Sequence, residues 1–100
     1  MSTVIEYTIR TKPGQYDAVV AAYVRFADRF GEVNPTENLI LVTGDRDNDL
    51  IRGIGVFGSK LEAEDVAGAG IFADFREHVA DFIIGQPERV ELELVHSFSK

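Results

Sequence analysis

The sequence predicts an α+β fold of the ferredoxin-like, split βαβ class, in which an antiparallel four-stranded sheet carries two helices on one face. The first observation is the order of the hydrophobic patterns, which follow the periods of strand and helix as β-α-β-β-α-β. The second is the length of 100 residues with 45% hydrophobic residues, which suits a single domain over residues 1–100. Right-handed crossovers then give the spatial strand order 4-1-3-2.

The first strand and helix are predicted from a change of period. Ile5, Tyr7 and Ile9 alternate with other residues within residues 3–11, which is typical of a half-buried strand. A helix is predicted over residues 15–30, because its apolar residues recur at helical spacing. These residues are Tyr16, Val19, Val20, Tyr23, Ala27 and Phe30. A glycine follows and is expected to end the helix.

The next two strands are predicted to form a hairpin. Residues 38–43 are apolar on both faces, residues 50–57 form the second run, and residues 44–49 between them are rich in turn formers. The aspartates of this turn resemble the start of a calcium-binding loop, but the glycine and glutamate that such a loop requires are absent, so a turn is favoured over a metal site. These aspartates are Asp45, Asp47 and Asp49.

The second helical region is predicted in two parts. Ser59 and Glu62 fit a capping box, which predicts a helix beginning at Ser59. The glycines within residues 68–70 should break or kink it, because each costs about 1 kcal/mol relative to alanine. A further helical segment is predicted over residues 71–84, and the last strand over residues 90–98. The second segment is expected to bury Phe72, Phe75, Val79, Phe82 and Ile83.

The two faces of the sheet are expected to differ. The residues predicted to face the helices are Ile5, Tyr7, Ile9, Ile54, Val56, Leu92 and Leu94. The opposite face is expected to hold Glu6, Glu91 and Glu93 close together, as an acid–base pair or an ion-pair network with Arg10, beside Ile51, Gly53, Gly55, Phe57 and Val95. The two glycines leave room for a ligand or partner, or mark a bulge or twist. Because a monomer would expose large apolar groups there, we expect a homodimer.

Composition narrows the possible partners. The formal net charge is −7 and the acidic residues are spread along the chain, which argues against binding to nucleic acid or to an anionic membrane. The absence of cysteine excludes disulfides and a thiolate nucleophile. No apolar run is long enough to span a membrane, and the first residues lack the pattern of a signal peptide, so a cytoplasmic protein is expected.

A family resemblance extends over the whole chain. Its features are the turn Lys12-Pro13-Gly14, the helix of residues 16–30, the strand end Val56-Phe57-Gly58-Ser59, the broken helix of residues 61–84, and the strand after Pro87. Together they resemble the antibiotic biosynthesis monooxygenases, which are dimeric α/β barrel proteins. The resemblance implies that two protomers pack sheet to sheet, with an active site between sheet and helices in each. Members include cofactor-free oxygenases of aromatic polyketides, quinol oxygenases and haem-degrading enzymes.

The sequence departs from the haem-degrading members. Those enzymes use an asparagine, a tryptophan and a histidine at positions that match Tyr7, Val66 and Phe75 here. The chain contains no tryptophan, so haem degradation is not expected.

Six side chains are candidates for the functional site. The catalytic candidates are Tyr7, His78 and His96. A histidine can act as a general base near neutral pH, and a tyrosine can orient a phenolic or quinone-like substrate; the alternatives are surface histidines and a tyrosine that ties strand to helix. The substrate-binding candidates are Arg52, expected on the helix side, and the core residues Phe72 and Phe75, which would also wall the pocket.

The sequence therefore predicts a small homodimer that acts as a cofactor-independent monooxygenase on an aromatic or quinone-like molecule, with no flavin or metal. The alternative is a non-catalytic module of the same fold that binds a small molecule or has a structural role. A cavity of at least about 300 Å³ holding the Tyr7 hydroxyl and a histidine would favour the enzyme, whereas a packed interior would favour the module.

Overall fold

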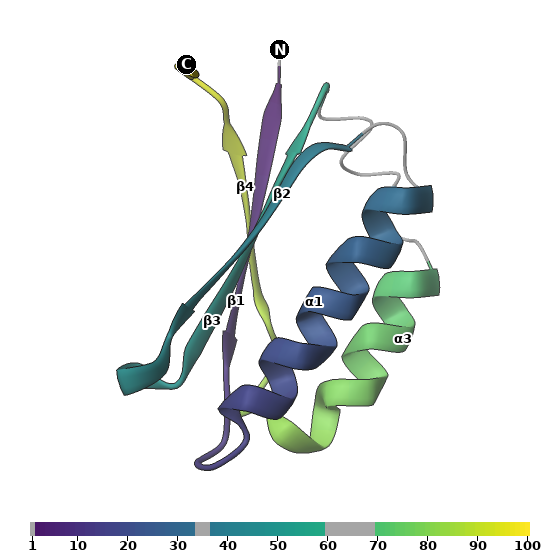
Figure 1. Cartoon of the computed structure of the whole chain (residues 1–100), viewed down its shortest axis with the longest axis vertical. Coiled ribbons are helices and arrows are strands. Elements are labelled where there is room, and N and C mark those ends of the chain that lie inside the picture. The colour runs from purple at the N-terminus through teal and green to yellow at the C-terminus, as the bar shows by residue number, and fades with distance from the viewer. Residues whose placement is uncertain (1, 34–36, 60–69) are drawn as a thin grey trace.

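One antiparallel sheet and the two helices α1 and α3, which lie together on one face of it, make up the described part of the chain (Figure 1). The computed structural model describes residues 2–33, 37–59 and 70–100. The elements are β1 (Thr3–Arg10), α1 (Tyr16–Val33), β2 (Glu37–Asp45), β3 (Leu50–Phe57), α3 (Gly70–Val79) and β4 (Glu88–Glu93). The strand order is β2-β3-β1-β4, which confirms the predicted ferredoxin-like arrangement.

Several element ends differ from the prediction. Helix α1 continues past Gly31 to Val33, because Gly31 has no positive φ that would turn the chain out of the helix. Helix α3 ends at Val79 and continues as a single 3-10 turn, Ala80–Phe82. The capping box of Ser59 and Glu62 and the predicted break at residues 68–70 extend into residues outside the described ranges.

The β2–β3 connection is a short turn, as the aspartate-rich sequence predicts. Strand β2 runs two residues further than expected, and a 3-10 turn over Arg46–Asn48 follows it. Asp49 closes the turn in the left-handed region, at φ 53°. The Asn48 amide donates a hydrogen bond of 2.8 Å to Asp45 Oδ2, which ties the two ends of the turn together.

The predicted orientation of β3 is wrong. Ile51 and Phe57 are buried on the helix side, and Ile51 pairs with the helix-facing Ile9 of β1. Ile54 and Val56, which were expected to face the helices, therefore lie on the opposite face, called the open face below. The error arises because β3 carries apolar residues at both parities, so alternation alone cannot tell the buried side from the exposed one.

Strand β4 is reversed in the same way. Glu91 pairs with Ile5 and so faces the helices, whereas Leu92 pairs with Val4 on the open face. Leu92, predicted to face the helices, is 41% exposed. Leu94 lies beyond the end of β4, which stops at Glu93 and not at residue 98.

The predicted cluster of three glutamates does not form. Glu6 pairs with Val90 on the open face, while Glu91 and Glu93 point toward the helix side. Successive residues of a strand alternate between faces, so one misplaced strand separates the set.

The core lies between the sheet and the two helices. Its buried residues include Ile9, Val19, Tyr23, Ala27, Ile51, Phe72, Phe75, Val79 and Ile83. Gly53 of β3 faces this core at a point where Tyr23 of α1 comes so close that a Cβ on residue 53 would collide with the Tyr23 hydroxyl. The missing side chain thus admits a core tyrosine, and neither a ligand nor a bulge accounts for it.

No helix in the described ranges has the length and apolarity that crossing a membrane would need.

Candidate functional site

Charged side chains lie on the helix-facing side of β4. Arg89 is directly opposite Tyr7 of β1, and its Nη1 lies 3.5 Å from Oε2 of Glu91. The second carboxylate oxygen, Glu91 Oε1, is buried and has no hydrogen-bond partner. The Arg89 and Glu91 side chains are 30% and 25% exposed, and a buried carboxylate oxygen without a donor carries a desolvation cost. This combination marks the β1–β4 edge as the candidate site.

The Tyr7 hydroxyl is the centre of this group. Burial raises the pKa of Tyr7 above its usual value near 10, and the charge and hydrogen bond of Arg89 act in the opposite direction, followed by the charge of Arg76. The net effect is upward, so Tyr7 stays protonated at neutral pH. It can therefore donate a hydrogen bond to a ligand, but it is a poor base.

An aromatic wall lies next to the hydroxyl. The Tyr7 and Phe72 ring centroids are 4.6 Å apart with the planes at 35°. The guanidinium carbon of Arg76 lies 5.2 Å from the Phe72 ring centroid on α3. Phe75 lies deeper, with its ring 4.8 Å from that of Phe26. Phe72 is thus the core residue that connects the polar group to Arg76.

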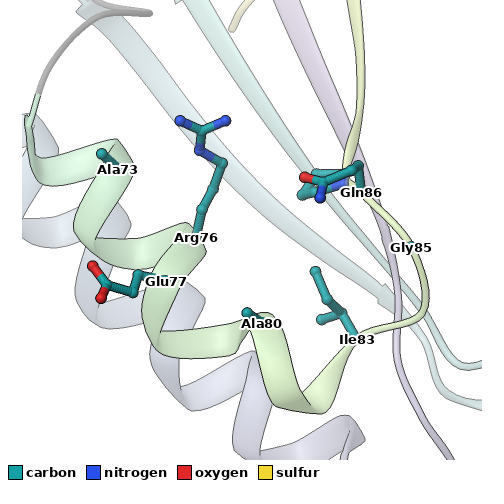
Figure 2. Close-up of a pocket in the computed structure, with 8 residues that line it drawn as sticks. Ala73, Arg76, Glu77, Ala80, Ile83, Gly85 and Gln86 are labelled. Carbon is teal, nitrogen blue, oxygen red and sulfur yellow. The ribbon is translucent and has the colours of Figure 1, made fainter.

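A pocket of about 240 Å³ opens beside this wall, between α3 and the segment that leads into β4. Its lining residues are Ala73, Arg76, Glu77, Ala80, Ile83, Gly85, Gln86 and Pro87. In Figure 2, Arg76 and Gln86 rise on opposite sides of the pocket, and the Glu77 carboxylate is directed away from both. A hydrogen bond of 2.7 Å from the Ile84 amide to the Arg10 carbonyl ties the segment between α3 and β4 to the end of β1.

Solved structures share this fold over almost the whole chain. One, from Chloroflexus aurantiacus, is provisionally named an antibiotic biosynthesis monooxygenase; it is 22% identical, the match covers 99% of this chain and 98% of that one, and the TM-score is 0.77. Another, from Nitrosomonas europaea, has the same provisional name, with 12% identity, 98% and 94% coverage, and a TM-score of 0.84. A protein of unknown function from Nitrosomonas europaea gives 13% identity, 99% and 94% coverage, and a TM-score of 0.86.

The chain has the antibiotic biosynthesis monooxygenase fold. No model of a protein family matches the sequence, and no curated protein matches it either.

Of the residues predicted for the site in this fold, Tyr7 lies where it was expected, on the helix-facing side of β1. Tyr7 does not line the pocket, and neither do the two histidines. His78 is exposed on α3, and His96 is exposed beyond the end of β4. The geometry therefore gives no support to the prediction that the two histidines act as general bases.

The prediction that Arg52 lies on the helix side is wrong. Arg52 pairs with Thr8 on the open face, where its Nε donates a long hydrogen bond of 3.4 Å to Thr8 Oγ1. The cause is the reversed orientation of β3. Phe72 and Phe75, by contrast, are buried, as the sequence predicted.

Two residues of the candidate site, Arg76 and Arg89, were missed by sequence reasoning, and Glu91 was predicted as part of a charged group but on the opposite face of the sheet. A signal was present, because Arg89, Glu91 and Glu93 alternate with Val90 and Leu92 along β4. Apolar residues of a strand are usually expected to face the helices, but in β4 the charged residues Arg89 and Glu91 face them. Within the described ranges, no group of three or more histidine, aspartate or glutamate side chains could hold a metal ion.

Proposed function

We propose that the protein is a homodimer that binds a small phenolic or quinol-like aromatic molecule between the sheet and α3, and oxygenates it without a cofactor. The observation that supports the proposal is the group of Tyr7, Arg89 and Glu91 on the helix-facing side of the sheet, with the Tyr7 ring against that of Phe72. Polar groups that converge on an aromatic wall are typical of sites that orient an aromatic ligand.

The chemistry needs only a proton acceptor and stabilisation of negative charge. Removal of a proton from an activated CH₂ group gives a carbanion whose charge spreads to the ring oxygen. The protonated Tyr7 hydroxyl and the Arg89 guanidinium stabilise that oxygen, and Glu91 takes the proton. The carbanion reduces O₂ itself, so the CH₂ group and one O₂ give a carbonyl group and one water.

The homodimer is proposed to form through the open face. Leu39, Val56, Val4 and Leu92 lie side by side in register across all four strands. The neighbouring row contains Leu41, Ile54, Glu6 and Val90. Leu39 is 49% exposed and Leu41 is 47% exposed, which is costly for adjacent leucines on a free surface. A second copy of the same sheet would cover both rows.

A second candidate function is a binding module without catalysis. The 240 Å³ pocket is lined by neither Tyr7 nor a histidine, and it is smaller than the roughly 300–1,000 Å³ typical of drug-sized ligands. This observation favours a small bound molecule over turnover.

Oxygen uptake separates the two candidates. The protein is mixed with anthrone, whose CH₂ group is activated by the adjacent rings, and O₂ consumption and anthraquinone formation are measured against buffer. For the enzyme we expect equal consumption of anthrone and O₂, with kcat/KM lowered about 100-fold by Tyr7→Phe. The matched control is His78→Gln, an exposed change on α3 that should leave the rate unaltered. Saturable binding without O₂ uptake would favour the module, and absence of both would overturn the proposal.

A further inference from the structure

We infer that the pocket between α3 and the segment leading into β4 binds the carboxylate of an aromatic acid, with Arg76 as the anion-binding residue. The inference rests on the proposed function in one respect, namely that the ligand of the protein is a small aromatic molecule. It adds the charge of that ligand and the residue that recognises it.

Arg76 is an available cation in an acidic protein. The net charge of the chain is −7, yet within residues 2–33, 37–59 and 70–100 the ion pairs are those of Arg46 with Asp17 and of Arg89 with Glu91. Arg76 has no carboxylate partner in these ranges. One carboxylate, Glu77, also lines the pocket, but it forms no ion pair with Arg76. A guanidinium that is not already paired is suited to bind an anion from solution.

The position of the Arg76 guanidinium is restricted by its neighbours. Its central carbon lies 5.2 Å from the Phe72 ring centroid, a cation–π distance that favours one orientation of the side chain. The adjacent Glu77 also lines the pocket, but its carboxylate is directed away from Arg76 and Gln86 (Figure 2). Gln86 lies on the opposite wall, where its amide can donate a second hydrogen bond. Two donors facing one space match the two oxygens of a carboxylate.

The size and remaining lining select an aromatic acid over an inorganic anion. The volume of about 240 Å³ exceeds what a single small ion fills, and Ala73, Ala80, Ile83 and Pro87 supply apolar contacts. A guanidinium at one side and an apolar wall at the other suit a planar ring that carries its charge at one end.

The expected affinity difference is moderate, since Arg76 is exposed. Exposed charge pairs contribute little to affinity, and a bidentate pair on a restricted guanidinium contributes somewhat more. We therefore expect about a tenfold preference for the anion at low salt, which should shrink as ionic strength rises.

The test compares salicylate with salicylamide, which differ in charge at one end of the same phenolic ring. Both are titrated into the ¹⁵N-labelled full chain, and amide shifts are followed, including the side-chain NH₂ of Gln86. We expect salicylate to bind about tenfold more tightly than salicylamide, with shifts at Arg76 and Gln86. Arg76→Gln should lower salicylate affinity to that of salicylamide and leave salicylamide unchanged. Arg25→Gln, an exposed change on α1, is the matched control.

The outcomes separate this inference from the proposed function. Equal binding of the two compounds at the pocket overturns the anion site but leaves aromatic binding intact. A preference for salicylate that survives Arg76→Gln, or shifts confined to residues away from the pocket, also overturns it. Failure of both compounds to bind overturns the inference and the proposed aromatic ligand together.

Discussion

Substituting Gly53 by alanine should strongly destabilise the fold. The Cβ of an alanine would overlap the Tyr23 hydroxyl and would come within 2.8 Å of the ring carbon Cε1. Tyr23 cannot move aside easily, because it is 3% exposed and its ring lies 5.0 Å from that of Phe75 and 5.7 Å from that of Phe26. Forcing an extra carbon into a packed core costs about 1–3 kcal/mol, and the closeness of this overlap indicates the upper part of that range.

Thermal unfolding measures the loss. A domain of this size loses about 4–8 °C in Tm per kcal/mol, so Gly53→Ala should lower Tm by roughly 10–20 °C. Gly70→Ala is the matched control: a Cβ there meets no atom within 4 Å, and the residue has no positive φ, so its Tm should stay the same or rise slightly. All samples need one protein concentration, because dimerisation would make Tm depend on it.

A double-mutant cycle identifies the cause. In a Tyr23→Leu background the ring is absent, so Gly53→Ala should lower the free energy of unfolding by about 1 kcal/mol less than it does in the original protein. A Gly53→Ala protein that loses less than about 0.5 kcal/mol would refute the packing argument, since ordinary surface changes already span that range. Equal penalties in the two backgrounds would show that the contact with Tyr23 is not responsible.

Three further predictions concern surfaces and titration. Leu41→Lys should give a monomer by sedimentation velocity, because it puts a charge in an apolar row of the open face, whereas Thr43→Lys on the polar part of the same strand should leave the assembly unchanged. Burial raises the pKa of the Tyr7 phenol above its usual value near 10, so folded Tyr7 keeps its proton at a pH where the unfolded chain loses it. The stability that this shift contributes is present below pH 10 and is lost as the pH rises through the raised pKa. Tyr7→Phe should remove the latest step from an alkaline absorbance titration. The hydrogen bond and charge of Arg46 hold the pKa of the Asp17 carboxyl below its usual value, so its NMR titration should move upward in Arg46→Met, and the stability it lends is lost only as pH falls through that lowered pKa.

The order of the elements was predictable from the sequence, because the apolar residues of a half-buried helix or strand recur with the period of that element. Residues 50–57 were predicted as a strand, and β3 occupies the same range. In α1, Val19, Tyr23 and Phe30 are buried as their helical spacing indicates. Ends were less predictable: β4 stops at Glu93 although alternation continues beyond it, because strand pairing needs a partner strand and β1 begins at Thr3, opposite Glu93.

Which face of β3 is buried was not predictable from its own residues. Both parities contain large apolar side chains, and a period of two gives no sign that distinguishes them. The buried face is determined by packing against α1, because the absent side chain of Gly53 leaves space for the Tyr23 ring, and Ile51 and Phe57 are buried on the same face. Such complementarity between elements 30 residues apart is a property of the packed structure.

The candidate site was half predictable for a related reason. Tyr7 could be placed because β1 alternates clearly, but Glu91 was assigned to the wrong side because the apolar residues of its strand were expected to face the helices. Arg89 was not considered. The expectation for apolar residues fails on an edge strand, where the Arg89 and Glu91 side chains lie on the helix side and are still 30% and 25% exposed. His78 and His96 were predicted as general bases from their residue type alone, and both are exposed.

The reversal of β3 and β4 changes the physical argument for a dimer. With the predicted orientation the open face would mix three glutamates with apolar groups, and a partner would have to bury charge. With the observed orientation the face divides: the rows that begin at Leu39 and Leu41 are apolar but for one glutamate, and the row of Thr43, Arg52, Thr8 and Glu88 is polar throughout. A twofold axis through the apolar half would pack the apolar rows of the two copies against each other and leave the polar row at the rim. Stable interfaces likewise have an apolar centre and a polar rim. A charge in the Leu41 row and one in the Thr43 row therefore test the position of that axis as well as the existence of the dimer.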